Sequence, residues 1–181
     1  MAFALSRSWR RTVLALHVLC GVGWMGLDIG LALLVATGLT TDDGATAAAA
    51  YTAARVVIPP VVPVLAGGML LTGVLLGLGT KWGLVQWTWV LSKLVIGIVL
   101  TILVAVALLP GVLAIPAELT GSAAEVRTAV GDEATGLMFP PVVSFLMLGT
   151  SLVLSLWKPG GRTRWAQTAR AGARAYSRAG K

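Results

Sequence analysis

Residues 10–43 read RRTVLALHVLCGVGWMGLDIGLALLVATGLTTDD, and this stretch decides the fold. Two arginines precede an apolar run, Val13–Leu39, and two aspartates follow it. The run exceeds the roughly 20 apolar residues that a helix needs to cross a bilayer core about 30 Å thick. It is also too long for the apolar region of a signal peptide, and no small-residue cleavage site ends it. We therefore expect a retained transmembrane helix with opposite charges at its two ends.

Three more apolar stretches of similar length follow, at residues 51–78, 84–109 and 136–157. Basic residues lie before the first stretch, between the second and third, and after the fourth: Arg7, Arg10, Arg11, Lys81, and seven Lys or Arg from Lys158 to Lys181. Six of the seven carboxylates lie in the other two connections: Asp42, Asp43, Glu118, Glu125, Asp132 and Glu133. Because Lys and Arg that flank membrane spans stay in the cytoplasm, both termini are predicted to be cytoplasmic.

The fold class predicted is an all-α polytopic membrane protein, a bundle of four transmembrane helices. No stretch alternates with the period of two that a membrane-spanning β-barrel requires. The composition agrees, because 57% of the residues are hydrophobic and 12% charged, whereas soluble domains have about 25% charged residues. The net charge of +7 is concentrated beside the ends of the spans. It therefore favours contact with anionic lipid headgroups over nucleic acid.

We divide the chain into a transmembrane domain, residues 1–160, and a basic cytoplasmic tail, residues 161–181. In the tail, Arg170, Arg174 and Arg178 recur every four residues, which fits a helix lying on anionic lipid or a solvated segment. The longest connection, residues 110–135, is expected to be an outer loop with a short surface helix at 117–130. Six tryptophans fall near the predicted cytoplasmic boundary, as in an aromatic belt: Trp9, Trp82, Trp87, Trp89, Trp157 and Trp165.

Two pairs of matching positions suggest that the bundle consists of two related helical hairpins. Pro-Pro-Val-Val occurs at 59–62 in the second span and at 140–143 in the fourth. His17 and Lys93 occupy matching places in the first and third spans. Similarity outside these positions is weak. A parallel two-plus-two repeat is therefore a hypothesis that rests on few residues.

Polar residues form stripes that are better placed against protein than against lipid. His17, Trp24 and Asp28 lie within about 40° on one face of a helix. The third span contributes Lys93, and the fourth contributes Ser144 and Ser151. These residues, with Arg55, are the candidate functional residues within the membrane. The bundle is expected to have a partly polar interior.

The charged residues among these candidates each allow two interpretations. A carboxylate within a bilayer is costly when ionised, so Asp28 either pairs with Arg55 or is a protonatable group in a transport path. Lys93 either extends its ammonium back to the cytoplasmic surface or forms an anion or headgroup site.

His17 is the only histidine, so a metal or cofactor site would need other ligands. No cofactor is predicted, but haem could be held by His17 with a methionine (Met25, Met69, Met138 or Met147), or by His17 of two subunits. His17, Cys20 and Met25 could bind Cu(I), which prefers soft sulfur ligands. Cys20 is the only cysteine, which excludes an internal disulfide. No motif of a soluble enzyme is present, so we do not expect an enzyme.

Several short motifs also resemble a known group of proteins. They are Leu16-His17-Val18, Val22-Gly23-Trp24-Met25-Gly26, Gly79-Thr80-Lys81-Trp82-Gly83-Leu84, Trp89-Val90-Leu91-Ser92-Lys93 and Leu156-Trp157-Lys158-Pro159-Gly160. In this order they resemble a bacterial family of small four-span integral membrane proteins of unknown function. The resemblance implies a bacterial cytoplasmic (inner) membrane. The spacing of His17 and Trp24 is also loosely similar to copper-resistance D-type permeases and to four-helix haem-linked protoporphyrinogen oxidases.

Three functions remain open from the sequence. The first is transport of a small solute or ion, or accessory work in a membrane complex, with a homo-oligomer or a partner membrane protein. The second is a haem- or copper-binding redox protein that uses His17. The third is a structural scaffold in which the polar stripes only hold helices together.

Overall fold

A computed structural model describes residues 6–80, 83–131 and 133–168, and this part of the chain is helical with no strand. The long helices are α1 (Arg7–Thr40), α2 (Gly44–Leu78), α3 (Thr88–Leu103) and α7 (Phe139–Trp157). A π-helical turn, η1 (Val104–Leu108), and α4 (Leu109–Ala114) continue α3. Two short helices, α5 (Ala123–Val130) and α6 (Glu133–Gly136), precede α7.

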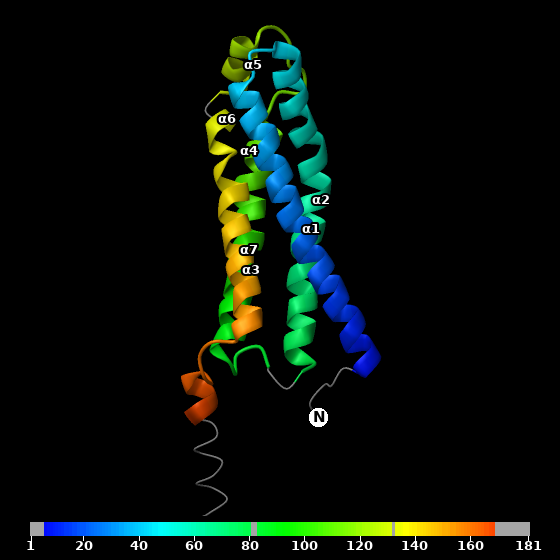
Figure 1. Cartoon of the computed structure of the whole chain (residues 1–181), viewed down its shortest axis with the longest axis vertical. Coiled ribbons are helices and arrows are strands. Elements are labelled where there is room, and N and C mark those ends of the chain that lie inside the picture. Colours follow the sequence, from blue (N-terminus) through cyan, green and yellow to red (C-terminus); the bar gives the residue numbers. More distant parts are fainter. Residues whose placement is uncertain (1–5, 81–82, 132, 169–181) are drawn as a thin grey trace, which may run out of the picture.

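Four of these helical stretches are long and apolar enough to cross a membrane: Arg7–Thr40, Gly44–Leu78, Thr88–Ala114 and Ala134–Trp157. The prediction of an all-α multi-pass membrane protein is therefore confirmed. Helix α1 packs against α2 and α7, and α3 packs against the same two helices, so the four spans form a ring. The two hairpins, α1 with α2 and α3 with α7, lie side by side along the bundle (Figure 1).

The two ends of the bundle differ. Helices α5 and α6 cover one end, which we call the cap end (Figure 1). At the other end lie the first turn of α1 and the last turn of α7, with Arg10, Arg11 and Lys158; we call this the basic end. Figure 1 shows α1 and α2 diverging from α3 and α7 toward the basic end. The tight part of the core therefore lies toward the cap end, where Leu31, Val35, Tyr51 and Val112 are buried.

Helix α2 begins seven residues before the apolar stretch predicted for it. The Asp43 side chain accepts a hydrogen bond of 2.9 Å from the backbone N–H of Thr46, which is the geometry of a helix N-cap. The residues that follow are mostly alanine, the best helix former. A hydropathy boundary therefore marks the membrane surface, whereas the cap marks the start of the helix.

The third span also extends beyond its predicted end, because η1 and α4 carry the helix to Ala114. Pro110 is the second residue after the π-helical turn, and because α4 continues α3 without a break this proline lies inside a continuous helix. The prediction that residues 110–114 belong to a loop is therefore wrong. The surface helix expected at residues 117–130 begins only at Ala123, where Ser122 and Glu125 form a capping box.

At the basic end, the segment after α7 packs along the segment before α3. The backbone N–H of Thr163 donates to the carbonyl oxygen of Gln86 at 3.0 Å. The Thr163 hydroxyl donates to the carbonyl oxygen of Val85 at 2.7 Å. The Arg162 guanidinium lies 5.4 Å from the centroid of the Trp87 ring, within cation–π range. Residues 164–168 form a helical turn. The proposed interfacial helix with Arg170, Arg174 and Arg178 lies outside the described residues.

Candidate functional site: a cation-lined cavity at the basic end

A cavity of about 540 Å³ lies between the four spans at the basic end. Its volume falls within the range of about 300–1,000 Å³ that is typical of small-molecule sites. Four basic side chains line it, namely Arg10, Arg11, Lys93 and Lys158. None of the described residues that line it is Asp or Glu. The cavity is therefore an environment of positive charge.

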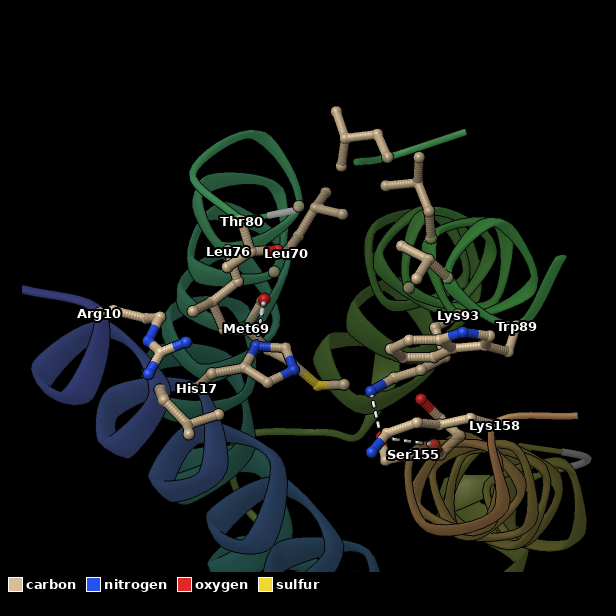
Figure 2. A pocket seen from close by; sticks show the side chains of 18 of the residues that line it. Arg10, His17, Met69, Leu70, Leu76, Thr80, Trp89, Lys93, Ser155 and Lys158 are labelled. Carbon is tan, nitrogen blue, oxygen red and sulfur yellow. Dashed lines mark hydrogen bonds between the residues drawn. The ribbon is translucent and has the colours of Figure 1, made fainter. Parts of the chain in front are cut away.

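The Lys93 side chain is oriented toward the interior of the bundle. Its ammonium donates a hydrogen bond to the hydroxyl of Ser155 on α7, and that hydroxyl in turn donates to the carbonyl oxygen of Ser151 at 3.2 Å. Figure 2 shows Lys93 and His17 facing one another from opposite walls of the cavity. The Lys93 ammonium is thus directed into the bundle, and its assignment to an anion or headgroup site stays a prediction.

His17 is positioned by α2. Its Nδ1 lies 3.0 Å from the carbonyl oxygen of Met69 and 3.0 Å from the Thr72 hydroxyl. The Thr72 hydroxyl donates to the carbonyl oxygen of Gly68 at 2.6 Å. Because a carbonyl only accepts, we assign the proton to Nδ1. The other ring nitrogen, Nε2, is then left for a ligand in the cavity.

The inner part of the cavity is apolar. Trp24, which is 1% exposed, and the buried Ala66 line its end toward the middle of the bundle. Leu70 on α2 and Leu94 and Gly97 on α3 line the walls, and Gly97 lies next to the Leu70 side chain. The cavity therefore changes from charged at the basic end to apolar at Trp24.

A second, smaller cavity of about 180 Å³ lies beyond Trp24, between α1, the α3–η1 segment and α7. Trp24 lines both cavities and separates them. Asp28 and Ser144 line the second cavity, and the Ser144 hydroxyl donates to the Asp28 carboxylate. The Trp24 indole N–H also lies near this carboxylate. The two groups do not form a hydrogen bond of normal distance and angle.

Arg55 does not pair with Asp28. Its guanidinium donates to the carbonyl oxygens of Leu113 at 2.5 Å and Ile115 at 2.8 Å, at the end of α4. Those carbonyls lack partners in the helix because the helix ends there, so a cation is favourable. The ion pair that we expected as one explanation of Asp28 is therefore not formed between the described residues.

The structure thus divides the sequence candidates into three groups. His17, Trp24, Lys93 and Ser151 line the first cavity. Asp28 and Ser144 form a hydrogen-bonded pair in the second. Arg55 holds the end of α4.

Sequence reasoning missed three functional candidates, Arg10, Arg11 and Lys158. It treated them as charges that only set the topology. Their helical positions carried the missing signal, since all three are exposed residues within one or two turns of a span end and line the opening of the cavity.

The ligand set proposed for copper is not assembled in the cavity. His17 lines it, whereas Cys20 and Met25 do not. In the part of the chain that the structure describes, no three His, Cys, Asp or Glu side chains cluster in a way that could hold a metal ion. The Met69 side chain, one of the methionines proposed as a partner of His17, does line the cavity.

Comparisons with protein-family models, with curated proteins and with solved structures find no match to this chain. The chemistry of the cavity is therefore what points to a function. It offers concentrated positive charge, a histidine nitrogen and an apolar inner wall within a membrane bundle.

Proposed function

We propose that this protein transports small organic anions across a bacterial cytoplasmic membrane. The distribution of basic and acidic residues supports an orientation in which the basic end faces the cytoplasm. The first cavity would then admit solutes from the cytoplasm, and both termini would lie on that side.

The observation that carries this proposal is the set of four basic side chains around one cavity with no carboxylate among its described lining residues. Lys93 lies within the third span, where a charge is expensive and is usually paired or functional, and the exposed Arg10, Arg11 and Lys158 add positive charge at the opening of the same cavity. A scaffold gains nothing from directing several cations at one space. An anionic ligand offsets this charge, and the low dielectric of the bundle strengthens the attraction.

Transport also requires a barrier that can change, and Trp24 is placed to be one. It separates the cation-lined cavity from the second cavity, which lies further toward the cap end. The adjoining η1 turn lines the second cavity, and π-helical turns are frequent at functional sites. We propose that a shift of Trp24 joins the two cavities during transport.

Flux into vesicles tests the proposal. Purified protein is reconstituted in liposomes, and uptake of radiolabelled benzoate is compared with uptake of radiolabelled tetramethylammonium. We expect benzoate uptake to exceed that of empty liposomes and tetramethylammonium uptake to equal it. Lys93→Ala should lower benzoate uptake by tenfold or more, because it removes the cation that faces into the middle of the cavity.

Arg7→Ala is the matched control, because Arg7 is an exposed cation on the first turn of α1 that does not line the cavity. It should leave uptake unchanged. Equal uptake of the anion and the cation, or benzoate uptake no greater than in empty liposomes, contradicts anion transport.

Haem binding is a second candidate, and the geometry of His17 favours it. Histidines that ligate metals usually donate their other ring N–H to a carbonyl or carboxylate, and the Nδ1–H of His17 donates to the Met69 carbonyl. The thioether of Met69 would be available as a second ligand, and the basic side chains suit the two carboxylates of haem. When bound, haem would supply one-electron chemistry.

An absorption spectrum decides between the two candidates. The protein is purified in mild detergent and its spectrum is recorded oxidised and reduced. A haem band near one per chain or per dimer, lost in His17→Ala, would establish the cofactor. A featureless spectrum, together with no change on adding hemin, would exclude it and leave anion transport.

A further inference from the structure

The change from charge to apolar wall along the cavity narrows the class of ligand. We infer that the cavity binds an amphiphilic anion, with a phosphate-type head at the basic end and a single apolar chain that extends toward Trp24. The inference rests on the proposed function and specifies its substrate class.

The outer part of the cavity is suited to a head with more than one negative charge. Arg10, Arg11 and Lys158 line the part of the cavity nearest the basic end. Lys93 lies further along the cavity, toward the middle of the bundle. Two of these are arginines, whose guanidinium forks match the oxygens of phosphate. A phosphate monoester carries up to two charges and three acceptor oxygens. It therefore neutralises more of this set than a single carboxylate does.

The inner part of the cavity provides the length for a chain. Trp24 lies seven residues beyond His17 on α1, and a helix rises about 1.5 Å per residue, so about 10 Å of wall separates the two. Over this length the wall is formed by Trp24, Ala66, Leu70, Leu94 and Gly97, with Ser151 as its one hydroxyl. A polar solute would leave this surface without partners, whereas an alkyl chain removes it from water.

A ligand with this chemistry can come from two sources. One is a free alkyl phosphate that enters from the aqueous side, and the other is a single-chain phosphate monoester lipid of the surrounding leaflet, such as a lysophosphatidic acid. Both place a phosphate at the same basic side chains. The experiment below includes a separate arm for each source.

Quenching of Trp24 fluorescence reports the position of the chain. The full-length protein is placed in phosphatidylcholine nanodiscs and titrated with 12-bromododecyl phosphate, whose bromine quenches a nearby indole. The signal of Trp24 is the difference between this protein and its Trp24→Phe variant. We expect saturable quenching of Trp24, and we expect neutral 12-bromododecanol at equal membrane loading to quench it at least tenfold less.

A binding series that does not use Trp24 tests the same inference if Trp24→Phe fails to fold. Radiolabelled butyl, octyl and dodecyl phosphates are bound to nanodiscs, and empty nanodiscs are subtracted. Each buried CH₂ strengthens binding by up to roughly fourfold. We expect octyl phosphate to bind at least tenfold more tightly than butyl phosphate, and Lys93→Met to weaken both, with Arg7→Ala as the unchanged control.

Each outcome has a distinct meaning. If inorganic phosphate and butyl phosphate bind as tightly as dodecyl phosphate, the inference that the ligand is amphiphilic is overturned, whereas the proposal of anion transport is not. If no anion binds, both proposals fall. If dodecanol quenches as well as the phosphate, the basic side chains do not select the head and the inference is overturned. Nanodiscs that contain a brominated lysophosphatidic acid distinguish the sources, since quenching of Trp24 without an added alkyl phosphate identifies a lipid.

Discussion

At the scale of single residues, Asp28 shows how a buried carboxylate is accommodated in this bundle. It is 5% exposed, and the Ser144 hydroxyl donates to it from α7. This contact joins the first and fourth spans near the middle of the bundle. It lies beyond Trp24, outside the cavity that holds the basic side chains.

Removing the serine hydroxyl should therefore destabilise the protein without affecting the first cavity. We expect Ser144→Ala to lower the free energy of unfolding by about 1–3 kcal/mol, because a buried acceptor loses its donor. Anion binding in the first cavity should not change. Thermal unfolding in detergent measures the loss. The double variant Asp28→Ala/Ser144→Ala should show a clear departure from additivity, and simple additivity would mean that the two residues act independently.

Gly38 is a second residue whose identity the packing requires. A Cβ atom at this position would lie 2.6 Å from two ring carbons of Tyr51, which is fully buried on α2. We expect Gly38→Ala to destabilise the protein by about 1–3 kcal/mol through overpacking. Gly30→Ala is the control on the same helix, because a Cβ there meets nothing within 4 Å. If both variants unfold at the same temperature, this contact does not limit the approach of α1 and α2.

At the scale of the elements, a carboxylate takes part in capping two helices of the cap end: Asp43 is the N-cap of α2, and Glu125 completes the capping box with Ser122 at the start of α5. A hydrogen bond from the Thr46 side chain, with others from backbone N–H groups, lowers the pKa of Asp43. Hydrogen bonds from the backbone N–H and the hydroxyl of Ser122 lower the pKa of Glu125. In both cases the folded state favours the ionised carboxyl, as expected at a helix N-terminus.

The sign of the resulting pH dependence follows. Because the folded pKa lies below the unfolded value of about 4, each cap contributes stability above that value and loses it as the pH falls through the folded pKa. The protection factors against hydrogen exchange at the first turns of α2 and α5, corrected for the intrinsic pH dependence of exchange, should therefore fall below about pH 4. Asp43→Asn should remove the response at α2, and Glu125→Gln should remove it at α5. An unchanged response in these variants would assign it to other groups.

Two pairs of positions bear on the proposed two-plus-two repeat, which stays a prediction. His17 and Lys93 do occupy facing walls of one cavity. The proline pairs, however, differ in context. Pro59 and Pro60 lie inside α2, whereas Pro140 and Pro141 lie in the first turn of α7. Proline in a first turn loses no intrahelical hydrogen bond, whereas in a helix interior it does. The shared motif therefore serves different purposes in the two hairpins.

At the scale of the whole molecule, the orientation in the membrane decides which compartment the cavity faces. The prediction is tested in a Cys20→Ser background with one added cysteine. Glu118→Cys lies in the exposed segment before α5, and Arg164→Cys lies in the exposed turn at the basic end. In intact cells we expect a membrane-impermeant maleimide to label the first and not the second. The reverse pattern would place the basic end outside and invert the proposed direction of access.

Hydropathy and charge in the sequence were sufficient to predict the four helical spans and their approximate positions in the chain. They were also sufficient to predict that one end of the bundle is basic and the other acidic. Both are local properties, because a bilayer acts on each segment separately according to its apolar length and the charges beside it. The polar stripes, and the helix faces that bear them, could be obtained in the same way.

Only the tertiary structure decided what those polar residues face. Asp28 contacts Ser144 rather than Arg55, and Arg55 contacts the carbonyls at the end of α4. Arg10, Arg11 and Lys158 share one cavity with Lys93, although these four residues come from α1, from α3 and from the end of α7. Such contacts depend on the order of the helices around the ring and on their relative heights. The order and the heights of the helices are set by packing between segments that are distant in the chain. The periodicity of a single helix does not specify this packing.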